Sequence, residues 1–162
     1  MQADFLYLMR QALKEAERGF SSGEVPVGAV LAGSDGEIVA KAHNQPITLN
    51  DPTAHAEILA IRKASMHYRN YRLDKAVLVV TLEPCLMCMG GIINARIAQL
   101  VFGAVDPKGG AAISLYNLAA DERLSHKVDV VSGIMEAECR ALMQRFFRVR
   151  RGKLNKGISL AF

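Results

Sequence analysis

The sequence contains no long hydrophobic run. No window approaches the roughly 20 apolar residues that a membrane-spanning helix requires, so the pattern of an integral membrane protein is absent. The first 20 residues are rich in apolar side chains but carry charges at Asp4, Arg10, Lys14 and Glu15. Because a secretory signal needs a basic start and an unbroken apolar stretch, we expect no signal peptide, no membrane association and a cytoplasmic location.

Cysteine is scarce as well. The three cysteines are Cys85, Cys88 and Cys139, and the first two form a Cys-x-x-Cys pair. An odd number with this pairing argues against a disulfide framework and favours metal binding or redox chemistry in a reducing compartment. Cys139 is spaced with Leu142 and Phe146 on one helical face, which predicts a small buried side chain.

Acidic residues are missing from the C-terminal segment. After Glu138 every charged side chain is basic: Arg140, Arg145, Arg148, Arg150, Arg151, Lys153 and Lys156. The whole chain has a net charge of only +4 and a pI near 9.1. Such a strip suits nucleic-acid binding and suits a solvated helix face with a frayed tail equally well, so charge alone leaves both open.

No internal repeat and no Pro- or Ser-rich linker divides the chain. Its 162 residues suit one domain, and 51% of them are apolar, enough for a real core. We therefore expect a single domain over residues 1–162 that ends in a basic C-terminal helix and tail.

Apolar periodicity predicts the element order α-β-β-α-β-α-β-α-β-α. Helical spacing falls at 4–21, at 53–64 with Thr53 as the cap, at 84–95, weakly at 114–120, and at 135–150. Strand-like runs fall at 27–31, 38–42, 76–81, 99–103 and 128–131, and a polar loop is expected at 44–51. Helices on both faces of one sheet give a three-layer α/β/α fold, with a five-stranded mixed sheet.

Two short motifs carry the chemistry. His55-Ala56-Glu57 lies near the start of the second expected helix, and Pro84-Cys85-Leu86-Met87-Cys88 opens the third. Cys85 and Cys88 lie on one face of a helical turn, where the positive helix end favours thiolates. With His55 they supply three zinc ligands, and a fourth, open position for water is typical of a catalytic rather than a structural zinc site.

Glu57 stands two residues from His55, within reach of the same pocket. A carboxylate beside zinc-bound water can take a proton from it and deliver protons to a ring nitrogen and a leaving amine. The order His-x-Glu followed by Pro-Cys-x-x-Cys is the known signature of zinc-dependent nucleobase deaminases. Either half alone would be a weak signal, but together they are specific.

The sequence resembles the bacterial tRNA-specific adenosine deaminases over nearly its whole length. The stretches that carry the resemblance are EVPVGAV at 24–30, HNQPITLNDPTAHAEI at 43–58, NYRL at 70–73, TLEPCLMC at 81–88, RIAQLVFGAVDPKGGA at 96–111 and FFR at 146–148. The resemblance implies a cytidine-deaminase-like fold, a homodimer, one zinc ion per subunit, and conversion of adenosine to inosine at the first anticodon position of tRNA.

The resemblance also assigns roles to the motif residues. His55, Cys85 and Cys88 would hold zinc, a hydroxide on the metal would attack C6 of adenine, and Glu57 would shuttle the protons. The backbone amide of Cys85 would steady the attacking oxygen at the helix start.

Five further residues are expected to bind the tRNA anticodon loop. Asn44 matches the family's base-contacting asparagine, although a turn residue is the alternative from its position alone. Asp106 would accept a hydrogen bond from a ribose 2′-OH, or would only shape an Asp-Pro turn. Lys108 and Arg148 would contact phosphates and Phe146 would stack on a base, but helical aromatics usually belong to the core.

Three other functions remain open at this point. The zinc motif also fits a deaminase of a free base or nucleoside such as guanine or cytosine. A zinc-stabilised RNA-binding module without catalysis would need a closed metal site, and Glu57 would then be incidental. A Cys-x-x-Cys thiol oxidoreductase would leave the His-x-Glu pair without a task.

Overall fold

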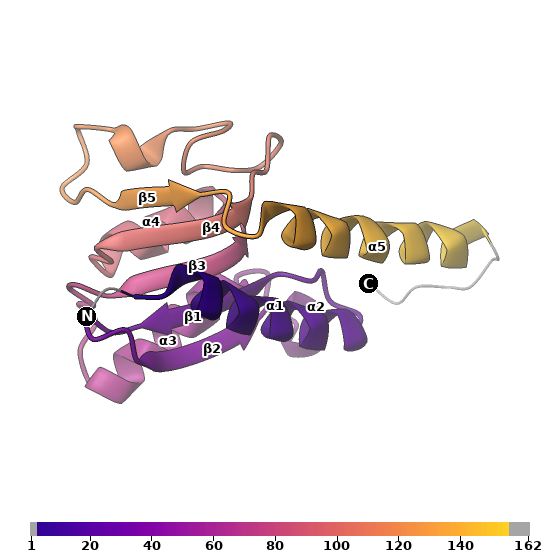
Figure 1. The fold of residues 1–162 in the computed structure, drawn as a ribbon, viewed down its shortest axis with the longest axis horizontal. Coiled ribbons are helices and arrows are strands. Elements are labelled where there is room, and N and C mark those ends of the chain that lie inside the picture. The colour runs from indigo at the N-terminus through magenta and orange to yellow at the C-terminus, as the bar shows by residue number, and fades with distance from the viewer. Residues whose placement is uncertain (1–2, 156–162) are drawn as a thin grey trace.

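A computed structural model describes residues 3–155 of the chain and shows one five-stranded sheet between helices (Figure 1). The strands are β1 (Gly28–Ala32), β2 (Ile38–His43), β3 (Val77–Leu82), β4 (Gln99–Ala104) and β5 (Asp129–Ser132). The helices are α1 (Phe5–Ser21), α2 (Pro46–Leu49), α3 (Ala56–Tyr68), α4 (Leu86–Asn94) and α5 (Glu136–Asn155), with a 3₁₀ turn at Leu118–Ala120. None of the described helices is long and apolar enough to cross a membrane.

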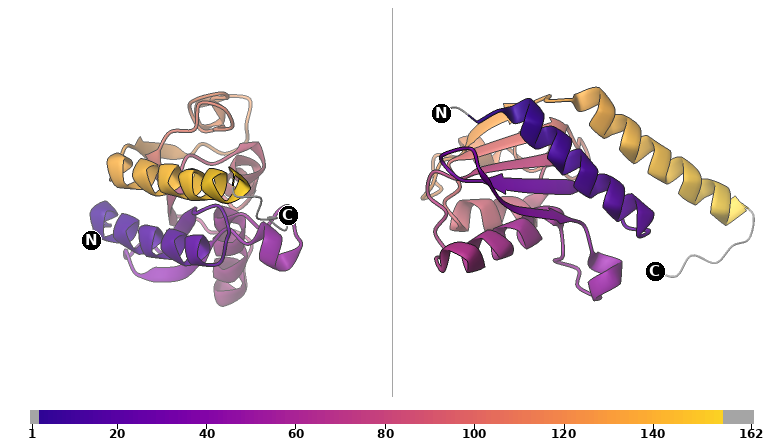
Figure 2. Two further views of the ribbon diagram at one scale, coloured as in Figure 1. Left: turned by 90° about the vertical axis from the view of Figure 1, so that its right-hand side faces the viewer. Right: turned by 60° about the horizontal axis from the view of Figure 1, so that its bottom comes forward.

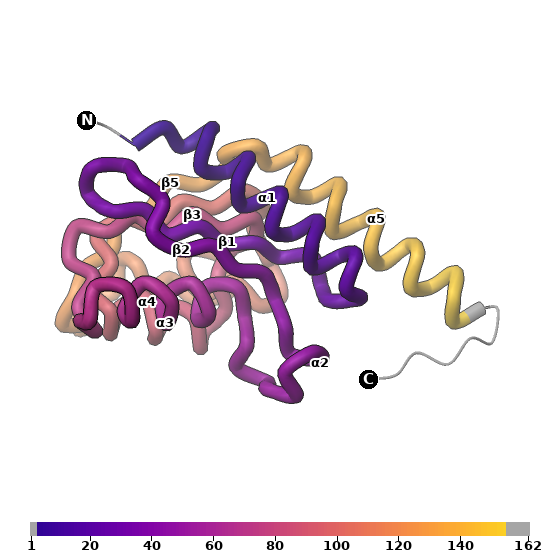
Figure 3. The backbone as a smooth tube through the Cα atoms, turned by 90° about the horizontal axis from the view of Figure 1, so that it is seen from below, coloured from indigo at the N-terminus to yellow at the C-terminus, as the bar shows by residue number. Residues whose placement is uncertain are grey.

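The sheet is mixed, with the strand order β2-β1-β3-β4-β5. β1 pairs antiparallel with β2 and β3, whereas β3, β4 and β5 run parallel. α1 and α5 cover one face, and α3 and α4 cover the other (Figure 3). The expected three-layer α/β/α fold is confirmed.

The central strand β3 shows how the two cores arise from one apolar run. Leu78 and Val80 belong to the cluster on the α3–α4 side, while Val77 and Val79 belong to the cluster on the α1–α5 side. Successive side chains of a strand point to opposite faces, so a strand buried on both faces must be apolar throughout. Cys139 is 2% exposed within the second cluster, as its helical spacing predicts.

Two local predictions are wrong near residue 50. The expected polar loop contains the short helix α2, which Pro46 begins. Thr53 does not cap α3, because its hydroxyl donates to Asp51 at 2.7 Å and closes the preceding turn. α3 begins at Ala56, and the side-chain oxygen of Asn44 accepts the N–H of Ala56 at 2.8 Å.

The prediction of a helix at 114–120 is also wrong. The backbone N–H groups of Ile113 and Ser114 bond to the carboxylate of Glu83, at 2.8 and 2.9 Å, rather than to carbonyls of a helix. Only the 3₁₀ turn remains at its end.

α5 runs to Asn155, beyond the expected residue 150, and projects past the sheet (Figures 1 and 2). Lys156 and the rest of the expected basic tail lie outside the described residues.

Candidate active site

The starts of α3 and α4 bring the two motifs together beside the end of β3. His55 and Cys85 are the residues that cap the two helices, both with extended backbone conformations. Cys88 is buried in the first turn of α4. Because His55 and Cys85 precede the helical turns, their side chains can turn toward each other and toward Cys88.

The three side chains fit a zinc ion. Nδ1 of His55 lies 3.6 Å from Sγ of Cys85 and 3.5 Å from Sγ of Cys88. Tetrahedral zinc with Zn–S of about 2.3 Å and Zn–N of about 2.05 Å would place nitrogen and sulfur about 3.6 Å apart. All three ligand atoms lie within 4.8 Å of one another, and no other group of three such side chains does so among residues 3–155.

The site also favours the thiolate that zinc binds. A hydrogen bond from Cys88 and one from His55 lower the pKa of Cys85 to about 4. The position of Cys85 at the N-terminus of α4 acts in the same direction. Three protein ligands of this kind leave a fourth position open to water, which distinguishes the site from a closed structural one.

Glu57 and Asn44 line the same cavity as the metal ligands. This cavity has a volume of about 270 Å³ and is lined by Val25, Val27, Asn44, Pro46, His55, Glu57, Leu82, Glu83, Cys85 and Asp106. Glu57 is 4% exposed, and burial raises its pKa to about 7. A carboxyl group of this kind can take and release protons near neutral pH.

Asn44 has a defined orientation in this cavity. Its side-chain oxygen faces the N–H of Ala56, so the amide must present its NH₂ group on the other side. Asn44 therefore lies in the segment that follows β2 and also on the wall of the cavity.

Glu83 is a cavity residue that the motifs did not reveal. It is 2% exposed and accepts hydrogen bonds from the N–H groups of Asp106 (3.0 Å), Ile113 (2.8 Å) and Ser114 (2.9 Å), and from the hydroxyl of Ser114. Burial raises the pKa of Glu83, but these hydrogen bonds outweigh burial and leave it below the usual value. An ionised Glu83 thus ties two parts of the loop between β4 and the 3₁₀ turn to the segment that carries Cys85.

Glu24 has a corresponding role for the short helix α2. It is 1% exposed, and its carboxylate accepts from the N–H and hydroxyl of Thr48 at 2.7 and 2.9 Å, and from the N–H of Ile47 at 3.4 Å. These bonds hold α2, whose Pro46 lines the cavity. No local sequence pattern indicates the roles of Glu24 and Glu83, because their hydrogen-bond partners lie more than 20 residues away in the chain.

Asp106 connects the cavity to a larger hollow beside α5. Its carboxylate accepts the N–H groups of Lys108 and Gly109 at 3.1 and 3.2 Å, so it does shape the Asp-Pro turn. The hollow has a volume of about 730 Å³, and its lining includes Asp106, Lys108, Arg140, Phe147, Arg148 and Arg151. The structure therefore brings Asp106, Lys108 and Arg148 together.

Phe146 lies elsewhere. It is 7% exposed and packs edge-on against Phe20 of α1, with the ring centroids 5.5 Å apart. Phe147, its neighbour, lines the hollow instead. The basic strip is likewise divided: Arg148 faces the hollow, whereas Arg145 pairs with Glu17 on the α1 side at 2.7 Å.

Comparison with known proteins gives consistent matches. The sequence profile of the cytidine and deoxycytidylate deaminase zinc-binding region matches residues 3–104, which include all three ligands and Glu57. The chain is 48% identical to the tRNA-specific adenosine deaminase of Bacillus subtilis (strain 168) over 94% of each chain. It is 46% identical to that of Streptococcus pyogenes serotype M18 (strain MGAS8232), over 90% of this chain and 91% of the relative.

The fold matches solved structures too. One structure, from studies of A-to-I editing by tRNA:A34 deaminases at the wobble position of transfer RNA, has a TM-score of 0.81 at 45% identity. The match covers 84% of this chain and 98% of that chain. The similarity therefore includes both the sheet and the helices that carry the metal ligands.

Proposed function

The chain belongs to the cytidine and deoxycytidylate deaminase family, and we propose that it converts adenosine to inosine at the first anticodon position of tRNA. The observation that carries this proposal is the arrangement of His55, Cys85 and Cys88 with Glu57 around one cavity. The near-complete match to tRNA-specific adenosine deaminases supports the choice of substrate.

The reaction is a hydrolysis in which Glu57 moves the protons. Zinc, when bound by His55, Cys85 and Cys88, lowers the pKa of water and so supplies the nucleophile at neutral pH. Glu57 takes a proton from the attacking water and passes it to the ring nitrogen next to C6. It then takes the remaining proton of that water from the oxygen now bonded to C6 and delivers it to the amino group. The C6–N bond breaks, ammonia leaves, and the oxygen remains on C6 as a carbonyl.

Two other groups would assist this attack, one by contacting the substrate and one by contacting the attacking oxygen. The NH₂ group of Asn44 would donate to an acceptor on the purine or the ribose, since its oxygen is engaged by Ala56. The backbone N–H of Cys85, at the start of α4, would stabilise charge on the attacking oxygen. Both groups belong to cavity-lining residues.

The hollow beside α5 would bind the RNA on one side of the target base. Lys108 and Arg148 supply positive charge there, and Asp106 lies where the hollow meets the cavity. A carboxylate at that junction suits a ribose 2′-OH, which distinguishes RNA from DNA. Phe146 would contribute through packing of α5 rather than through stacking, because Phe20 covers its ring.

We also propose a homodimer in the cytoplasm. Large apolar side chains are exposed at the start of α4 and in the loop between β4 and the 3₁₀ turn, with Leu86 54%, Leu115 54% and Tyr116 50% exposed. The side of α4 that carries Gly90 is open, since a side chain there would meet nothing within 4 Å. A second copy would cover this surface, and an odd number of cysteines with a Cys-x-x-Cys pair suits a reducing compartment.

A parallel assay tests the substrate class. Zinc-loaded protein is mixed with an anticodon stem-loop RNA that has adenosine at the first anticodon position, and separately with free adenosine and with guanine. We expect inosine in the RNA and no turnover of the free compounds. Turnover of a free base without RNA editing would favour the salvage-type deaminase instead.

A further inference from the structure

Glu15 is a buried carboxylate that belongs neither to the metal site nor to the cavity around it. It lies on the face of α1 that covers the sheet. Its Oε1 accepts a hydrogen bond of 2.7 Å from Arg18, and its Oε2 lies 3.4 Å from Nδ1 of His43. Since a carboxylate only accepts hydrogen bonds, we assign a proton to Nδ1 of His43, which donates it to Glu15.

The two partners of Glu15 differ in what they connect. The side chain of Arg18 is 70% exposed and lies three residues further along the same helix, so this ion pair contributes little. The side chain of His43 is only 19% exposed and belongs to the end of β2. The contact with His43 therefore joins α1 to the edge strand of the sheet, and a buried carboxylate needs such a partner.

Two glycines let the backbone of α1 come close enough for this contact. Gly28 of β1 pairs with His43 across the sheet. A Cβ atom on Gly28 would collide with the carbonyl oxygen of Ala12 and the backbone nitrogen of Ala16. A Cβ atom on Gly19 would already touch Cβ of His43, at 3.4 Å. A side chain at Gly28 would thus hold α1, and with it the carboxylate of Glu15, away from the end of β2.

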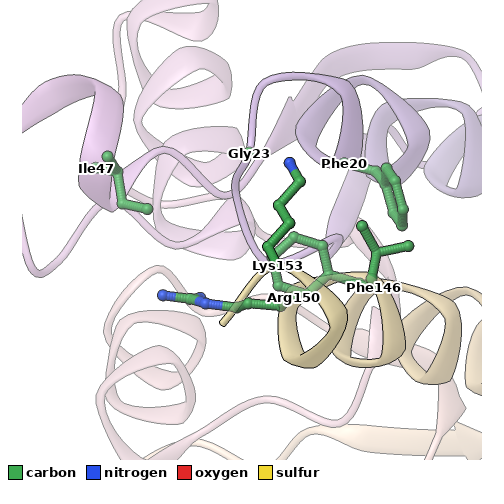
Figure 4. Close-up of a pocket in the computed structure, with 7 residues that line it drawn as sticks. Phe20, Gly23, Ile47, Phe146, Arg150 and Lys153 are labelled. Atoms are coloured by element: carbon green, nitrogen blue, oxygen red, sulfur yellow. The ribbon is translucent and has the colours of Figure 1, made fainter. Parts of the chain in front are cut away.

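α1 is also held from its other side, by α5. Phe20, near the end of α1, packs edge-on against Phe146 of α5 (Figure 4). Glu17 pairs with Arg145 of α5 at 2.7 Å. Because α1 is packed between α5 and the sheet, Glu15 provides a fixed acceptor for the last residue of β2.

His43 and Asn44 are consecutive residues whose side chains serve opposite faces of the sheet, as alternation along a strand requires. His43 contacts Glu15 on the α1 side, whereas the side-chain oxygen of Asn44 accepts the N–H of Ala56 on the α3 side. The N–H of Asn44 donates to the carbonyl of Val27 at 3.1 Å, and α2 begins two residues later. One planar peptide unit joins the two residues, so a shift of His43 displaces Asn44 as well.

We propose that Glu15 and His43 are positioning residues for the deamination, and that their contact fixes the end of β2 so that the NH₂ group of Asn44 is oriented toward the substrate. The inference rests on the proposed function, in which Asn44 contacts the substrate. Neither Glu15 nor His43 lines the cavity, so both act through Asn44. Binding groups must be held within about 0.5 Å of their productive geometry by the residues behind them.

A double-mutant cycle tests whether His43 acts through Asn44. His43→Phe keeps a ring but lacks the donor, and we expect it to lower kcat/KM for the stem-loop about three- to tenfold, chiefly through KM, the effect of one ordinary hydrogen bond. His43→Asn keeps a donor near the same place and should restore most of this loss. In the Asn44→Asp background, where the donor to the substrate is already gone, His43→Phe should change kcat/KM by less than about twofold. An equal loss in both backgrounds would overturn the proposal.

Arg18→Gln is the matched control, because it removes the other partner of the same carboxylate without touching β2. We expect its kcat/KM to stay within about twofold of that of the unchanged protein, as for an exposed ion pair. All variants should retain one zinc ion per subunit. If Arg18→Gln lowered kcat/KM as much as His43→Phe, the unpaired charge of Glu15 rather than the placement of β2 would be responsible, and the proposal would fail.

The position of Asn44 can also be measured without substrate. Hydrogen exchange followed by NMR reports the N–H of Ala56, which is bonded to the side chain of Asn44. In His43→Phe we expect this N–H to exchange about tenfold faster relative to that of Val79 in the central strand β3, which corrects for global stability, and the NH₂ signals of Asn44 to shift. Arg18→Gln should leave both unchanged.

Unchanged exchange of Ala56 together with unchanged NH₂ signals in His43→Phe would overturn the positioning role, whatever happens to turnover. If the unchanged protein formed no inosine in RNA, the proposed function would fail. The exchange of Ala56 and the NH₂ signals of Asn44 would still show whether the contact between Glu15 and His43 positions Asn44.

Discussion

The side-chain oxygen of Asn44 accepts a hydrogen bond of 2.8 Å from the backbone N–H of Ala56, the first residue of α3. This bond joins the end of β2 to the helix that carries Glu57. It also leaves the amide of Asn44 with only donors for a ligand. One residue thus supports the local fold and has a fixed polarity toward the cavity.

Asn44→Asp separates these two functions. The aspartate can still accept from Ala56, so we expect the melting temperature and the zinc content to stay close to those of the unchanged protein. It can no longer donate to the substrate, which should lower kcat/KM about ten- to a hundredfold, the range expected for about 1–3 kcal/mol of lost hydrogen bonding. Asn44→Ala should lose stability as well as activity. Wild-type kcat/KM in Asn44→Asp would show that the amide does not contact the substrate.

Glu57→Gln tests proton transfer. Glutamine has the same size but cannot carry the proton, so kcat should fall by about 10²–10⁴. Zinc should be retained at one ion per subunit, as measured by elemental analysis, because Glu57 is not among the three clustered ligands. Zinc retention with lost turnover distinguishes a catalytic site from a structural zinc module. An active variant would remove Glu57 from the mechanism.

The two kinds of cysteine should respond differently to substitution. Cys88→Ala removes a ligand, so zinc binding and activity should both be lost, and stability should fall because zinc binds the folded state. Cys139→Ala is the matched control, since this thiol is buried beside Met9 with its sulfur 3.9 Å from the methionine sulfur. It should keep one zinc per subunit, with a melting temperature lowered only by lost packing. Zinc loss from Cys139→Ala alone would contradict the assignment of ligands.

Glu83 should be required for the loops that border the cavity. Glu83→Gln keeps the shape but turns an NH₂ group toward one of the donors, which costs about 1–3 kcal/mol for the unsatisfied group. We expect a lower melting temperature and a higher KM for the stem-loop, because Asp106 is displaced when its N–H loses this partner. Glu37→Gln, at an exposed position of the β1–β2 hairpin, is the control and should change neither. An unaltered KM in Glu83→Gln would show that this carboxylate does not position the RNA-binding loop.

Local patterns predicted most of the fold. The helical spacing of α1 and the alternation or continuity of the strands depend on neighbours within a few residues, and each of these elements lies within a few residues of its expected position. The three ligands were predictable for the same reason, because each motif fixes its side chains at a helix start. The family resemblance added the substrate, which spacing alone left open.

The errors occurred where distant residues compete for the backbone. Segment 114–120 has helical spacing, but Glu83, about 30 residues earlier, takes the N–H groups of Ile113 and Ser114. Thr53 looks like a cap, but Asn44 satisfies the start of α3 from the preceding strand. The division of the basic residues between two sides of α5 likewise depends on where α1 packs, which the periodicity of α5 alone does not specify.

The central claim is that the cavity deaminates one adenosine of the anticodon loop. The most direct measurement uses stem-loop RNAs that carry a single adenosine at each loop position in turn, incubated with zinc-loaded protein and with Glu57→Gln. Inosine is then quantified by nuclease digestion and chromatography. We predict inosine only when the adenosine occupies the first anticodon position, and none with Glu57→Gln. Inosine at every position, at another position only, or undiminished with Glu57→Gln would contradict the account.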